Sequence, residues 1–206
     1  MIYFLLQATI GKKFLEDFRA FWSLPKEWIL RLGEDGVTGF GQQSIPLDSL
    51  PDVRRVVLRL GPVLDQKTGP FPAMLGLTRK CLGGAAGSGR QFLSWVHRDD
   101  AVAAFVAALT RPEMSGVYNV CAPGAVTNAE FMRELRAAVG RPWVPAAPEF
   151  VVRFVAEHHF FTDGNLALHG QRCAPKKLLA TGFKFAHPAV GPAIRDLLNN
   201  SVKALN

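Results

Sequence analysis

Apolar residues recur along this chain in two patterns, one typical of buried strands and one typical of amphipathic helices. Residues Arg55 to Leu60 set valines and leucines side by side, as in a strand that is buried on both faces of a parallel sheet. The run Ala101 to Leu109 is apolar and long enough for a helix, which Arg111 and Pro112 end. Thr127 and Glu130 have the spacing of a capping box, which predicts that a helix begins there.

The N-terminal quarter has a different character. Phe14, Phe18 and Phe21 fall at helical spacing and predict a helix that ends before Pro25. Residues 1–10 are apolar, but at this length periodicity does not decide between a strand and a helix. Residues 23–51 hold several prolines and glycines and predict a long irregular insertion, a kind of segment that often binds something. Further helices are expected at 70–81, 150–155 and 190–198, and a flexible turn at 83–89.

Composition adds a basic charge to this picture. The 206 residues are 49% hydrophobic and 20% charged, enough to bury one sizeable core in one or two small domains. A formal net charge of +7 is compatible with a nucleic-acid, anionic-membrane or acidic-protein partner. It equally fits a protein from a basic compartment such as an organelle matrix, and no polybasic cluster stands out.

The three cysteines indicate free thiols in a reducing compartment. Cys81, Cys121 and Cys173 are far apart and lack the C-x-x-C spacing of a zinc site, so we expect no metal site. The apolar residues 1–10 are too short to span a bilayer, and the Lys-Lys pair that follows them is in the wrong order for a signal peptide.

The segment Gly87 to Asp100, GSGRQFLSWVHRDD, carries the most specific motif. Its glycine turn, short strand and Trp-Val-His-x-Asp-Asp ending resemble the extended short-chain dehydrogenase/reductases, in particular an epimerase-like branch with a small C-terminal domain of unknown function. The residues RVVLRLGPVL at 55–64, GVYNV at 116–120 and VTNAEF at 126–131 resemble the same family. The resemblance covers about residues 53–198.

The resemblance implies an α/β fold, namely the C-terminal part of a doubly wound, Rossmann-like parallel sheet followed by a small appended α/β domain. We accordingly predict three regions. Residues 1–52 would form a helix and an irregular insertion, 53–125 a partial Rossmann-like region, and 126–206 the small C-terminal domain. Because only the later strands are matched, we expect the flank of the strand at 55–60 to lack ladder partners.

The chemistry that the resemblance implies lies largely outside the matched region. The family places a glycine-rich dinucleotide turn at the start of the chain, whereas the only such spacing here, Gly33 to Gly39, is acidic and has no helix after it. Its catalytic tyrosine is followed by a lysine four residues later. Tyr3 and Tyr118 are followed at that spacing by Gln7 and Ala122. We therefore predict no catalytic residue and no NAD(P) site in this chain unless the missing half is supplied.

A remnant of the cleft is the remaining candidate site, formed by Arg59, Gly61, Arg90 and His97. The two arginines match family positions at which cofactor and substrate meet, where a guanidinium can bind an anion bidentately. Each is equally well explained as a surface residue paired with a carboxylate. His97 is more simply a hydrogen-bonded structural histidine beside a buried Trp95. The Asp99-Asp100 pair is expected to cap the following helix.

Together these observations predict a degenerate, non-catalytic family member that serves as a structural subunit of a larger protein assembly. The compartment expected is an organellar matrix or stroma, in a mitochondrion or plastid, with the cytoplasm as the alternative. The alternative function is an incomplete NAD(P)-dependent epimerase or oxidoreductase whose first half is missing. An RNA-associated scaffold rests on net charge alone.

Overall fold

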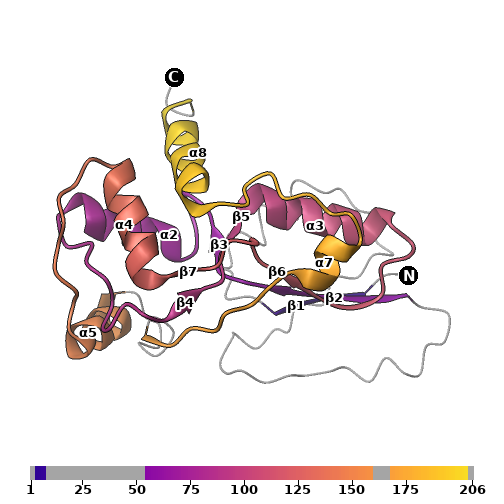
Figure 1. The fold of residues 1–206 in the computed structure, drawn as a ribbon, viewed down its shortest axis with the longest axis horizontal. Coiled ribbons are helices and arrows are strands. Elements are labelled where there is room, and N and C mark those ends of the chain that lie inside the picture. The colour runs from indigo at the N-terminus through magenta and orange to yellow at the C-terminus, as the bar shows by residue number, and fades with distance from the viewer. Residues whose placement is uncertain (1–2, 8–53, 160–167, 204–206) are drawn as a thin grey trace.

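A computed structural model describes residues 3–7, 54–159 and 168–203 of the chain (Figure 1). The helix expected near residues 14–22, the insertion at 23–51 and the glycines at 33–39 lie outside the described residues. The strands are β1 (Tyr3–Gln7), β2 (Arg55–Leu60), β3 (Val63–Leu64), β4 (Phe92–Leu93), β5 (Val96–His97), β6 (Gly116–Val120) and β7 (Val126–Thr127). The helices are α2 (Pro70–Arg79), α3 (Arg98–Thr110), α4 (Asn128–Ala138), α5 (Glu149–His159), α7 (Lys176–Ala180) and α8 (Val190–Lys203).

The main sheet has three parallel strands in the order β1-β2-β6. Val57 of β2 lies opposite Leu5 on one side and Val117 on the other. The prediction that one flank of β2 lacks a ladder partner is therefore wrong, because residues 3–7 form a strand and fill that position. Periodicity did not decide between a strand and a helix for the apolar residues 1–10, and the pairing shows that residues 3–7 form a strand.

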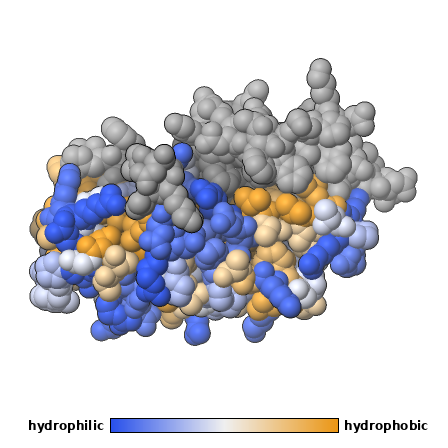
Figure 2. All heavy atoms as spheres, turned by 90° about the horizontal axis from the view of Figure 1, so that it is seen from above, coloured by the Kyte–Doolittle hydropathy of each residue, from blue (hydrophilic) through white to orange (hydrophobic). Residues whose placement is uncertain are grey.

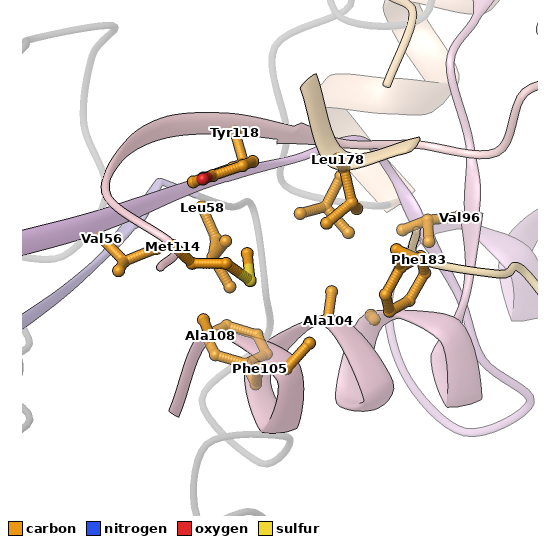
Figure 3. Packing of buried hydrophobic residues seen from close by; sticks show 13 residues of the cluster. Val56, Leu58, Val96, Ala104, Phe105, Ala108, Met114, Tyr118, Leu178 and Phe183 are labelled. Carbon is orange, nitrogen blue, oxygen red and sulfur yellow. The ribbon is translucent and has the colours of Figure 1, made fainter. Parts of the chain in front are cut away.

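One core lies between the main sheet and the helices α3 and α7. The side chains of Val56 and Leu58 on β2 point toward Ala104 and Ala108 of α3, and Leu178 of α7 closes the cluster (Figure 3). All of these side chains are fully buried. Alternate residues of β2 therefore face this core, which is why the strand reads as a dense apolar run.

The outward side of α3 is also apolar. Its residues Val102, Val106 and Leu109 are partly exposed, and apolar residues gather on the right of the surface seen from above, on the side where α3 lies in Figure 1 (Figure 2). A helix that is apolar on every side is typical of a buried position.

None of the helices in the described ranges is long and apolar enough to cross a bilayer.

A second core surrounds Trp95 and joins α2, α4 and α8. Phe71, Phe131 and Ile194 come from these three helices and are fully buried with Trp95. The indole Nε1 of Trp95 donates a hydrogen bond to the carbonyl oxygen of Gly124 at 3.1 Å. The predicted burial of Trp95 is confirmed, and its polar atom has the partner that burial requires.

The predicted capping box at the start of α4 is confirmed. The backbone N–H of Glu130 donates to Oγ1 of Thr127 at 3.3 Å, and the backbone N–H of Thr127 donates to Oε2 of Glu130 at 2.8 Å. The bond from the Thr127 backbone N–H, and a second bond from the Thr127 hydroxyl to the same oxygen at 2.9 Å, lower the pKa of the Glu130 carboxyl. A local pattern of two residues was enough to locate this helix terminus.

Arg54, which precedes β2, closes the C-terminal end of α3. Its Nη1 donates to the carbonyl oxygens of Ala108 at 2.9 Å and Met114 at 2.8 Å, and its Nη2 donates to that of Leu109 at 3.3 Å. The last carbonyls of a helix have no partner within the helix, and a cation there also complements the helix dipole. Arg54 thus links the sheet to the end of its covering helix.

We expect Arg54→Met to lower the free energy of unfolding by about 1.5–3 kcal/mol, because hydrogen bonds from a charged donor are lost and the carbonyls are left unpaired. Urea denaturation of both variants provides the measurement. The matched control is Arg55→Met at the neighbouring, exposed arginine, which should stay within about 0.5 kcal/mol of the parent. Equal effects of the two substitutions would contradict the role given to Arg54.

Candidate functional site

The carboxyl ends of the parallel strands meet at one edge of the main sheet. In open α/β sheets, ligands bind in the crevice beyond this edge. β2 ends at Leu60 and β6 at Val120, so Gly61 and Cys121 are the first residues past it. Two of the residues that the sequence singled out, Arg59 and Gly61, therefore lie at or next to this edge.

Gly61 is required by a close backbone crossing. A Cβ atom at this position would lie 1.7 Å from the carbonyl oxygen of Ser94, so no larger residue fits without a shift of the backbone. Its own N–H donates to the carbonyl oxygen of Val120 at 3.0 Å. The glycine thus has a complete structural explanation, and a role in cofactor binding stays a prediction.

The two candidate arginines stand on different elements. Arg59 is exposed on β2, and Arg90 is exposed in the turn before β4. Its backbone N–H donates to Oγ of Ser88 at 3.4 Å. Within the described residues, neither guanidinium forms a salt bridge with a carboxylate. The reading of Arg59 and Arg90 as anion-binding residues stays a prediction.

Cys121 is fully buried at the end of β6. Burial, together with a smaller contribution from the nearby Cys173, raises the pKa of its thiol to about 11. A thiol with such a pKa is almost entirely protonated at neutral pH, and the thiolate is the reactive form. Cys121 is therefore not an activated nucleophile, although it lies at the carboxyl end of β6.

Tyr118 belongs to the core rather than to a catalytic site. Its side chain is buried on β6, and the backbone N–H of Ser115 donates to its hydroxyl oxygen at 3.3 Å. The Nζ of Lys177 lies 4.2 Å from the ring centroid, over the ring face. The prediction that Tyr118 is a packed ring is confirmed. Its lysine neighbour contacts the ring face and comes from α7, not from the next turn of a catalytic helix.

His97 is the residue that caps α3. The helix begins at Arg98, and the Nδ1 atom of His97 accepts a hydrogen bond from the backbone N–H of Asp99 at 3.2 Å. The prediction that Asp99 or Asp100 caps the helix is therefore wrong. Both aspartates lie inside the first turn, where their charge favours the positive end of the helix dipole. The sequence placed the helix start correctly, but the histidine provides the acceptor.

Asp100 has a different role, which is to hold a distant segment. Its two carboxylate oxygens accept hydrogen bonds from the backbone N–H groups of Ala186 at 2.7 Å and His187 at 2.9 Å. The carboxylate is almost fully buried. This pair of bonds fixes the segment before α8 against the N-terminal turn of α3.

His187 is thereby placed against the fully buried ring of His97. The two imidazole rings stack with centroids 3.8 Å apart and planes inclined by 29°. The Nε2 of His97 lies 3.5 Å from Oδ2 of Asp196 on α8, and its Nδ1 lies 3.8 Å from Oδ2 of Asp99. We call His97, Asp99, Asp100, His187 and Asp196 the histidine cluster. His97 was singled out from the sequence, whereas no sequence signal pointed to His187 or Asp196.

The electrostatics of the histidine cluster favour a neutral His97. Burial lowers the pKa of His97 below its ordinary value and His187 lowers it further, while the carboxylates of Asp99, Asp196 and Asp100 act in the opposite direction. Because Nδ1 accepts a hydrogen bond, the proton of the neutral ring is on Nε2, which faces Asp196. The 3.5 Å separation is long for a hydrogen bond, and among the described residues Nε2 has no hydrogen-bond partner.

The histidine cluster contains the residue types of a transition-metal site, and one ligand atom from each of His97, Asp99, His187 and Asp196 lies within 4.8 Å of the others. Its geometry does not fit. A histidine binds a metal through a lone pair in its ring plane, and the lone pairs of two nearly parallel, stacked rings do not converge on one ion. The Nδ1 lone pair of His97 is also already used by the helix cap. We therefore assign no metal to these residues.

The crossing at Gly61 gives a direct test of the sheet edge. We expect Gly61→Ala to lower the free energy of unfolding by about 1–3 kcal/mol or more, because the added methyl overlaps a backbone carbonyl. Gly76→Ala is the matched control, because a Cβ at this position in α2 would meet nothing within 4 Å. That change should stabilise the helix by up to about 1 kcal/mol. Urea denaturation of the two variants compares them, and a neutral Gly61→Ala would show that the crossing is not tight.

Comparison with known proteins identifies relatives across this region. Residues 147–197 match a family described as a domain of unknown function (DUF1731). The chain is 40% identical over 146 residues to the epimerase family protein SDR39U1 of Mus musculus, covering 70% of this chain and 48% of the relative. It is 33% identical over 157 residues to the chloroplastic SDR39U1 homologue of Arabidopsis thaliana, covering 76% of this chain and 44% of the relative.

A solved structure agrees with these matches. The crystal structure of human epimerase family protein SDR39U1 (isoform2) with NADPH superposes with a TM-score of 0.66 at 36% identity, covering 72% of this chain and 49% of that protein. The chain thus spans about half the length of the relatives it matches. With its parallel sheet and its C-terminal domain, this chain belongs to the epimerase-like branch of the extended short-chain dehydrogenase/reductases and represents a C-terminal part of that fold.

Proposed function

We propose that this chain forms the substrate-side half of an NAD(P)-dependent epimerase or oxidoreductase, whose nucleotide-binding half is supplied by additional sequence or by another chain. The observation that carries the proposal is the similarity to the human relative, whose structure contains NADPH and of which this chain matches 49%.

The main sheet has edge strands to which a strand of the other half could pair. In the order β1-β2-β6, the two outer strands each have a ladder partner on one side only within the described residues. Unpaired N–H and C=O groups of an edge strand are a template for another strand. Arg59, exposed near the carboxyl end of β2, and Arg90, exposed in the turn before β4, each have the charge to hold an anionic group of a substrate or cofactor.

We expect the pyrophosphate cradle to come from the other half. Such a site needs a strand, a glycine turn and a helix whose free N–H groups point at the phosphate. β2 is followed by Gly61 and Pro62 but then by the short strand β3, and the first turn of α3 is capped by His97. Hydride transfer would therefore depend on groups from the other half, and we derive no catalytic step from this chain alone.

A non-catalytic structural subunit of a larger assembly is the second candidate. It is favoured by large apolar side chains that are exposed on and before α5, where Trp143 is 78% and Phe150 is 73% exposed. Exposed aromatic residues of this kind are common anchors in protein interfaces. An organellar location, in a mitochondrion or plastid, belongs to the same proposal, and a plant relative is described as chloroplastic. An RNA-scaffold role has only the net charge of +7 in its favour.

Measuring the mass of the native polypeptide and its affinity for NADPH separates these functions. We expect a native polypeptide well above the 22.5 kDa of this chain, or a stable complex with a second chain, that binds NADPH saturably. Energy transfer from tryptophan to the bound nucleotide follows the titration. The 206-residue chain alone should show no saturable binding. A native 22.5 kDa polypeptide that binds no NADPH in any of its complexes would overturn the enzyme proposal and favour the structural subunit.

A further inference from the structure

The histidine cluster joins parts of the molecule that belong to different cores. His97 is the last residue of β5 and the N-cap of α3, and the nearby Val96 and Ala101 pack in the first core. His187 lies in the segment 185–189, which runs from Phe185 at the first core to α8 in the second. The contacts of the histidine cluster therefore hold the segment 185–189 in place where it passes from the first core to the second.

Two kinds of contact hold this segment to α3. The carboxylate of Asp100 accepts the two backbone hydrogen bonds from Ala186 and His187, and the ring of His187 stacks on that of His97. The helix α8 itself is anchored separately, since Ala193, Ile194 and Leu197 are buried in the second core. Loss of the stack would thus affect the segment 185–189 while α8 stays anchored in the second core.

The stacked arrangement requires at least one neutral ring. Protonation of His97 would place an N–H on Nδ1, where the backbone N–H of Asp99 now donates, and would remove the helix cap. Two protonated rings with centroids 3.8 Å apart would also repel each other strongly in a partly buried site. We call the segment closed when it is bound to α3 by these contacts. Neutral rings therefore favour the closed segment, and the closed segment favours neutral rings.

The charged groups around the pair come from every element that packs against it. Asp99 and Asp100 belong to α3, Asp196 to α8, and Arg98 is paired with Asp65 at 2.9 Å and with Asp99 at 3.2 Å. The carboxylates favour a protonated His97, but burial and the second histidine oppose them and outweigh them, so that the pKa of His97 is lowered. Arg98 further reduces the charge that Asp99 presents to the ring.

We propose that the histidine cluster is an acid-sensitive latch, in which proton uptake by the stacked His97–His187 pair releases the segment 185–189 from the N-terminal turn of α3. The released state is local: both cores stay packed, while the backbone N–H groups of Ala186 and His187 lose their acceptor on Asp100 and exchange with solvent. The proton is the ligand of this site, and it comes from bulk water through the half-exposed side of His187.

The direction of the response follows from linkage. In the closed state the pKa of His97 lies below the ordinary value of 6.5, so the released state binds the proton more tightly. Acidification therefore favours release, beginning near pH 6.5 and continuing until the pH falls below the lowered pKa. Above this window the latch does not respond. Carboxylates with ordinary pKa values titrate at lower pH, near about 4.

Hydrogen exchange of the full chain tests the latch between about pH 7.5 and 5, a range that brackets the ordinary pKa of histidine. After correction for intrinsic exchange rates, the amides of Ala186 and His187 should open up to about tenfold more per pH unit on acidification, the limit for a single proton. Amides in the middle of α4 should not follow this slope. If they follow it, or if the two amides show no slope, the proposal of a local latch is overturned.

Variants assign the response to the pair. His97→Asn keeps a side-chain acceptor for the cap but does not titrate in this range, so it should remove the slope. His187→Phe keeps a stacked ring without a second proton site, and it should also weaken the slope while leaving the buried core intact. His169→Asn, at an exposed histidine outside the histidine cluster, is the matched control and should behave as the parent. A parental slope in both His97→Asn and His187→Phe would exclude the pair as the proton site.

Discussion

The close crossing of Gly61 over the backbone of Ser94 is the constraint on which the rest of the described structure depends. A Cβ atom there would lie 1.7 Å from the Ser94 carbonyl oxygen. The end of β2 can therefore approach the segment Gly87–Asp100, here called the signature segment, only because residue 61 is glycine. Ser94 in turn donates from Oγ to the carbonyl oxygen of Gln171 and accepts the N–H of Cys173. Ser94 thus connects the sheet, through its backbone, with residues 171–173 of the C-terminal region, through its hydroxyl.

Trp95 and His97 extend this connection to the two cores. Trp95 follows Ser94 directly and fills the middle of the second core, while its indole N–H fixes Gly124. His97 is two residues further and starts the helix that covers the main sheet. Three residues of the signature segment therefore have successive structural roles: Ser94 is crossed by Gly61, Trp95 fills a core and His97 caps a helix. None of these roles is catalytic, although the segment is the most specific mark of the family.

Local patterns in the sequence predicted most of the fold. The strand at Arg55–Leu60, the capping box at Thr127 and the burial of Trp95 depend on neighbours in sequence or on residue type, and all three are confirmed. Two predictions were wrong: that one flank of β2 lacks a ladder partner, and that Asp99 or Asp100 caps α3. The first failed because residues 3–7, distant in sequence, pair with β2. The second failed because His97 supplies the cap, while Asp100 is engaged by the distant backbone of His187. The histidine cluster could not be predicted, because its members lie up to about a hundred residues apart and have no shared motif. The three-region division and the cleft role of Arg59 and Arg90 stay predictions.

The pairing of β1 with β2 has a consequence for any complementing half. Parallel pairing gives β2 one ladder partner on each side, and β6 already occupies the other side. The place held by Tyr3–Gln7 therefore admits one occupant at a time. A complementing half that brings its own strand to β2 has to displace these residues, whereas one that adds its strand outside β1 extends the sheet by an additional position. Assembly is thus a choice between strand exchange and strand addition, and the two products differ in the number of strands between β6 and the incoming half.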